Sequence, residues 1–98
     1  MNDNKNEDIK AIRFYSPRGM EYAVVAARPN TGAAIAFNRI AKKWNVSRNS
    51  YYQMVLSGDY KRISDEQAKS IYQDVPPDTS LLDEIDMLRG IGGNAEAE

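Results

Sequence analysis

Clusters of turn-forming residues divide this chain into short apolar segments, and that division limits the folds it can adopt. Pro, Gly, Asn, Asp and Ser gather at 16–19, 29–32, 57–59 and 76–77, and Gly90 follows the last apolar segment. Because Pro and Gly interrupt helices and strands, no single element can be long. A chain of 98 residues also buries too little surface for two separate cores. We therefore predict one small domain built from short elements.

Residues 9–26 predict a small N-terminal β-hairpin. Both halves are rich in β-branched and aromatic residues, and the turn-forming residues at 16–19 separate them. A short helix over 20–28 is the alternative, because Met20 and Val24 lie four positions apart, as side chains on one helix face do. The sequence leaves these two structures open for the second half.

Apolar residues recur at helical spacing after residue 30. Phe37, Ile40, Ala41 and Trp44 occupy positions i, i+3, i+4 and i+7, so they predict one buried stripe on a helix that runs from about 31 to 44. In that stripe Trp44 is expected to be a core residue.

Three further helices are expected. Ser47 is the predicted N-cap of the first, which ends near residue 56. Ser64 and Gln67 match the capping box that begins the next helix, over 64–74. Leu81, Ile85 and Leu88 then give a stripe at i, i+4 and i+7. They predict a last helix over 80–89.

The segment from Phe37 to Leu56, FNRIAKKWNVSRNSYYQMVL, resembles the helix-turn-helix of the Cro and phage-repressor (XRE-like) family. The matching positions are Ile40 and Ala41 in the first helix, an apolar residue before the turn, and Asn45 at the turn itself. Asn tolerates the positive φ of a tight turn better than other non-glycine residues. The likeness extends over about residues 37–75.

This resemblance implies a mainly α fold, a helix-turn-helix bundle of about four helices with the small hairpin at its N-terminus. One domain would span 9–90, with the helix-turn-helix at 31–57. The polar tails at 1–8 and 91–98 are expected to be disordered.

The resemblance also implies a DNA-binding site. In this family the second helix, here 47–56, enters the major groove by its N-terminal end, while the first lies across the phosphate backbone. The candidate base-reading residues lie off the buried face of that helix and are Ser47, Arg48, Asn49, Tyr52 and Gln53. The candidate phosphate contacts are Lys42, Lys43, Lys61 and Arg62.

Charge is unevenly distributed along the chain. The formal net charge is -1. Residues 1–37 hold five basic and four acidic side chains, 38–62 hold six basic and one acidic, and 63–98 hold two basic and nine acidic. The middle segment therefore carries +5, which is the local electrostatic footprint of a nucleic-acid-binding surface.

Enzymatic chemistry is not expected. The chain lacks Cys and His, which excludes zinc fingers, thiolate nucleophiles and Ser-His-Asp triads. Asp83, Glu84 and Asp86 lie around one predicted helix without converging, so we expect no catalytic site, no metal and no cofactor. Without an apolar run long enough for a signal peptide or membrane span, the chain is expected to be cytoplasmic, with no membrane partner.

These patterns predict a sequence-specific transcriptional regulator, such as a repressor or control protein of a phage or mobile element. Its partner would be double-stranded DNA, bound as a homodimer through the stripe Leu81, Ile85 and Leu88. The alternative is a protein-binding inhibitor or accessory module that uses the hairpin edge or the acidic C-terminal helix.

Overall fold

The computed structural model describes residues 10–20 and 22–88, which form one sheet and three helices. The strands are β1 (Arg13–Pro17), β2 (Val25–Ala27), β3 (Ala34–Asn38), β4 (Lys43–Val46) and β5 (Tyr60–Ile63). The helices are α2 (Tyr51–Ser57), α3 (Asp65–Tyr72) and α4 (Thr79–Leu88). The tails predicted at 1–8 and 91–98 and the end of the helix predicted at 80–89 lie outside the described residues.

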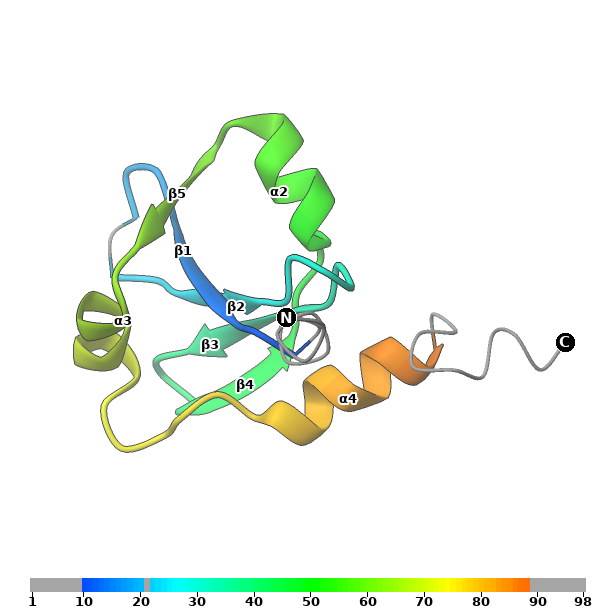
Figure 1. The fold of residues 1–98 in the computed structure, drawn as a ribbon. Coiled ribbons are helices and arrows are strands. Elements are labelled where there is room, and N and C mark those ends of the chain that lie inside the picture. Colours follow the sequence, from blue (N-terminus) through cyan, green and yellow to red (C-terminus); the bar gives the residue numbers. More distant parts are fainter. Residues whose placement is uncertain (1–9, 21, 89–98) are drawn as a thin grey trace, which may run out of the picture.

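The sheet is antiparallel, with strand order β4-β3-β2-β1-β5 (Figure 1). This arrangement corrects the predicted fold class, because the chain combines a five-stranded sheet with helices and is not a mainly α four-helix bundle. The β1–β2 pair is the predicted hairpin, and residues 25–27 are strand rather than helix. Both of its strands have a second neighbour, so β4 and β5 form the edges of the sheet.

Residues 34–46 form a strand, a turn and a second strand where the first helix of a helix-turn-helix was predicted. Phe37 and Trp44 are directly opposite each other in the β3–β4 register, and their ring centroids lie 5.1 Å apart. A spacing of seven residues thus brings them together across a hairpin, as it would on two turns of a helix. Ile40 distinguishes the hairpin from the predicted helix, because it lies in the turn and is 95% exposed, whereas the helix would have buried it.

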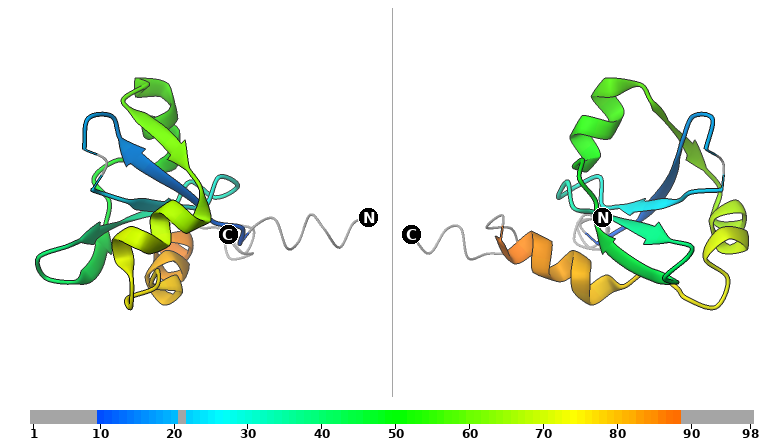
Figure 2. Two further views of the ribbon diagram at one scale, coloured as in Figure 1. Left: turned by 90° about the vertical axis from the view of Figure 1, so that its left-hand side faces the viewer. Right: turned by 180° about the vertical axis from the view of Figure 1, so that it is seen from behind.

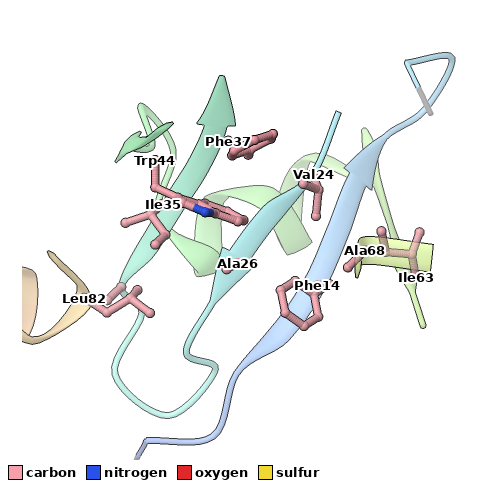
Figure 3. Packing of buried hydrophobic residues seen from close by; sticks show 10 residues of the cluster. Phe14, Val24, Ala26, Ile35, Phe37, Trp44, Ile63, Ala68 and Leu82 are labelled. Atoms are coloured by element: carbon pink, nitrogen blue, oxygen red, sulfur yellow. The ribbon is translucent and has the colours of Figure 1, made fainter. Parts of the chain in front are cut away.

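Alternation along the strands gives the sheet two different faces. One face contributes Phe14, Ala26, Ile35 and Phe37 to the main core, which α3 and α4 cover with Ala68 and Leu82 (Figure 3). The residues on the other face are packed beneath α2. They are Tyr15, Val25, Ala27 and Ala34, in contact with Met54. Figure 1 shows α2 and α4 on opposite sides of β2 and β3.

Capping explains where α2 and α3 begin. Ser64 and Gln67 form the predicted capping box of α3, in which each side chain accepts a hydrogen bond from the other residue's backbone N–H. A second capping box, formed by Ser50 and Gln53, begins α2. The predicted N-cap Ser47 is therefore wrong by three positions, because Ser50 is followed by a Gln at the third helical position and Ser47 is not.

A buried ion pair ties α4 to the end of β2. The guanidinium of Arg28 donates from Nη1 to Asp83 at 2.8 Å and to Asp86 at 2.6 Å. The side chains of Arg28 and Asp86 are 3% and 12% exposed, whereas that of Asp83 is 49% exposed. On the same helix, Leu81 and Ile85 pack against the core, which leaves less apolar surface for the predicted homodimer.

Substitution of Arg28 by Met should lower the free energy of unfolding by about 3 to 5 kcal/mol, because Asp86 would stay buried without its partner. Asp83→Asn should cost about 1 kcal/mol or less, since water already solvates that carboxylate. Urea unfolding of the two variants measures both values. Equal effects would show that burial of the pair does not determine the stability of α4.

Asp78, which directly precedes α4, should make the free energy of unfolding depend on pH in the acid range. Asp78 accepts hydrogen bonds from the Ser80 hydroxyl at 2.6 Å and the Leu81 amide at 3.2 Å, and these lower its pKa from the usual 3.8. A lowered pKa stabilises the fold above the unfolded-state value, and the contribution is lost as pH falls through the folded-state value. Asp78→Asn, which keeps a side-chain oxygen that can accept both hydrogen bonds, should remove this dependence. The check is urea unfolding at a series of pH values, where a constant difference between the two proteins below pH 4 would contradict the assignment.

Candidate nucleic-acid interface

The turn between β3 and β4 is closed by one side chain. Asn38 Oδ1 accepts hydrogen bonds from the backbone N–H groups of Ile40 and Ala41, both at 2.9 Å. Its backbone carbonyl accepts a 2.6 Å hydrogen bond from the N–H of Lys42, which has a φ of 56°. Left-handed backbone is costly for a lysine, so the turn is held by these three hydrogen bonds rather than by local preference. These three hydrogen bonds close the turn at residues 38–43, which we call the tip.

Three cations lie on this tip. Arg39, Lys42 and Lys43 are all exposed, and the tip projects from the rest of the molecule (left view of Figure 2). From residue 22 to residue 62 the chain carries a single carboxylate, Asp59, which lies between α2 and β5. The hairpin therefore presents concentrated positive charge on a two-stranded ribbon.

A groove of about 570 Å³ runs beside the same hairpin. Ala36 and Asn45 are paired across β3 and β4 and lie on the α2 side of the sheet, where Ala36 packs against the cluster beneath α2. Tyr22 and Arg39 also line the groove, with the Arg39 guanidinium carbon 5.3 Å from the centroid of the Tyr22 ring. The lining residues are Tyr22, Ala23, Ala36, Phe37, Asn38, Arg39, Ile40 and Asn45.

The predicted base-reading residues are not arranged as on a recognition helix. Ser47, Arg48 and Asn49 precede α2, and only Tyr52 and Gln53 belong to it. All but Tyr52 line a small hollow of about 220 Å³ between β4, α2 and α4. Their polar groups are partly engaged, because Gln53 completes the capping box of α2, Ser47 accepts from the amide of Asn49, and Asn49 Nδ2 lies 3.5 Å from the Tyr60 hydroxyl.

Burial beneath α2 raises the pKa of the nearby Tyr15 hydroxyl, and its hydrogen bond with Tyr51 adds to the effect.

The four predicted phosphate contacts fall into two groups. Lys42 and Lys43 lie together on the β3–β4 tip, whereas Lys61 and Arg62 lie on β5 at the opposite edge of the sheet. The four side chains therefore do not form one continuous surface that could contact a single stretch of DNA phosphates. The tip is the group in which a third cation, Arg39, joins the predicted pair.

Sequence reasoning missed Arg39, Tyr22 and Asn45 as site residues. Arg39 falls within the helix predicted over 31–44, and Asn45 matches the turn position of the helix-turn-helix. The alternation of Ala36, Phe37 and Asn38 is the signal that could have identified a strand here. It was hidden because the same stretch also satisfies helical spacing.

Most of the acidic residues described lie on the core face of the sheet, opposite the face that α2 covers. They belong to α3, α4 and the segment between these helices, which cover the core face of the sheet. They are Asp65, Glu66, Asp74, Asp78, Asp83, Glu84 and Asp86. Asp74 comes nearest to the tip, because it lines a hollow with Arg39 and Lys42, but neither cation forms an ion pair with it in the part of the chain described.

Residues 10–20 and 22–88 contain neither a metal-binding cluster nor a membrane-spanning helix. No three acidic side chains gather there as a metal ion would require, and no helix in these ranges is both long and apolar enough to cross a membrane. Comparison of the chain with protein-family models, with curated proteins and with solved structures gives no significant match. The surface described above is therefore the basis for the proposed function.

Proposed function

We propose that this chain binds double-stranded DNA through its β3–β4 hairpin. The observation that carries the proposal is the grouping of Arg39, Lys42 and Lys43 on a hydrogen-bonded, projecting turn. The major groove of B-DNA admits a two-stranded β-ribbon as well as a helix, and cations at the end of such a ribbon can neutralise phosphates. The hairpin thus replaces the predicted helix 47–56 as the reading element.

The distribution of charge supports one orientation on DNA. The cationic tip and the acidic helices α3 and α4 belong to different parts of the molecule, so a polyanion attracts the first and repels the second. The proposal retains the predicted cytoplasmic location and regulatory role. It also retains the homodimer, which would place two hairpins on one DNA site.

Removal of two charges from the tip tests the proposal. Lys42→Asn suits the left-handed backbone of the turn, and combined with Lys43→Gln it removes two phosphate contacts. The plot of log affinity against log salt should flatten by about 1.8 per subunit, and binding should weaken on all sequences alike. Fluorescence anisotropy with random duplex DNA, from low to moderate salt, measures both effects.

The matched control is Lys61→Gln with Arg62→Gln, which removes the same charge from β5. It should change the salt dependence much less, because β5 is at the other edge of the sheet. If the β5 variant loses the binding and the tip variant keeps it, the hairpin is not the DNA contact. If folded wild-type protein binds no duplex at the lowest salt, DNA binding itself is contradicted.

A protein partner is the second candidate, and the exposed face of α2 favours it. Tyr52, Val55 and Leu56 follow helical spacing on its outer side and are 46%, 53% and 85% exposed. The two surfaces predicted earlier fit this role less well, since both strands of the β1–β2 hairpin are already paired and Asp83 and Asp86 are bound to Arg28. A salt-insensitive interaction that Leu56→Asp abolishes would favour a protein partner over DNA.

A further inference from the structure

The groove beside the hairpin has features that phosphate binding does not explain. Its lining includes Ala23 and Ala36, whose side chains end at Cβ, and the exposed Ile40. Its volume of about 570 Å³ lies within the range of small-molecule sites. A surface that only contacted phosphates would need no apolar hollow next to its cations.

An aromatic ring and a guanidinium lie next to each other in the lining of the groove. Tyr22 is 53% exposed, and the Arg39 guanidinium carbon lies 5.3 Å from its ring centroid. Planar aromatic and guanidinium groups are the surfaces on which proteins stack unpaired nucleobases. Asn45 adds a side-chain amide, whose donor and acceptor can meet the edge of a base.

We propose that this groove holds one unpaired nucleobase of a DNA strand whose phosphates contact Arg39, Lys42 and Lys43. The inference rests on the proposed DNA binding and specifies which DNA the surface prefers. Charge complementarity selects this occupant, because a nucleotide joins a flat apolar ring to an anion, and the groove joins apolar lining residues to the Arg39 guanidinium, with Lys42 and Lys43 on the same turn. A mismatched, bulged or single-stranded segment supplies such a base at lower cost than a paired duplex.

The test compares three DNAs, namely a paired duplex, the same duplex with one bulged thymine, and a single-stranded oligothymidylate. Wild-type protein should bind the two unpaired DNAs more tightly than the duplex. Tyr22→Ala should weaken binding to the unpaired DNAs about tenfold and weaken binding to the duplex much less, because the stacking surface is lost while Arg39, Lys42 and Lys43 remain. Tyr22→Phe keeps the ring and should behave as wild type.

Three further measurements separate stacking from a change in the fold. Ala36→Leu adds bulk to the lining of the groove and retains the Tyr22 ring, so it should cause the same selective loss. A fluorescent base analogue at the bulge should be quenched by wild type and by Tyr22→Phe, but not by the other two variants. Thermal unfolding of each variant identifies any that is not folded.

The outcomes distinguish this inference from the function on which it rests. Equal affinity of wild type for paired and unpaired DNA, or an equal loss on both with Tyr22→Ala, would overturn the base site and leave duplex binding intact. Tyr22-dependent binding of single strands without any duplex binding would support the base site and contradict the duplex proposal. Absence of binding to all three DNAs would overturn both.

Discussion

The pairing of β3 with β4 positions both the aromatic residues of the core and the turn that carries the cations. It places Phe37 against Trp44 with 5.1 Å between ring centroids, so both strands of the hairpin contribute side chains to the core. Trp44 also donates from Nε1 to the carbonyl of Val75 at 2.8 Å, which fixes the segment between α3 and α4 to the sheet. At the other end of the same pairing, Asn38 closes the turn that carries the cations. One strand pair thus links the core to the candidate site.

Alternation along β3 and β4 separates the functions of the two sheet faces. Large apolar side chains at Ile35 and Phe37 face α3 and α4, whereas Ala36 and Asn38 face the opposite side and line the groove. A register slip of one residue would exchange these sets and bury polar groups in the core. The packing requirement that stabilises the fold therefore also maintains the open face beside the basic tip.

The sequence was informative where a pattern has a single physical interpretation. The Ser64 capping box and the burial of Trp44 were predicted and are confirmed, and a hairpin is present near the N-terminus as the β1–β2 pair. The helix predicted at 31–44 was wrong, because its seven-residue spacing also fits a hairpin and because strand pairing is decided by distant partners. Lys42 and Lys43 were visible as local charge, but the approach of Tyr22 to Arg39 follows only from the β2–β3 register.

The most direct test of the central claim is NMR mapping of backbone amide shifts during titration with duplex DNA that contains one bulged thymine. If the β3–β4 hairpin binds the DNA, the largest shifts occur at residues 38–45 and at Tyr22, and the shifts on α3 and α4 are small. The shifts at 38–45 should also diminish with added salt, since phosphate contacts release counterions. Shifts concentrated on α2 or α4, with residues 38–45 unaffected, would contradict the hairpin as the DNA-binding element.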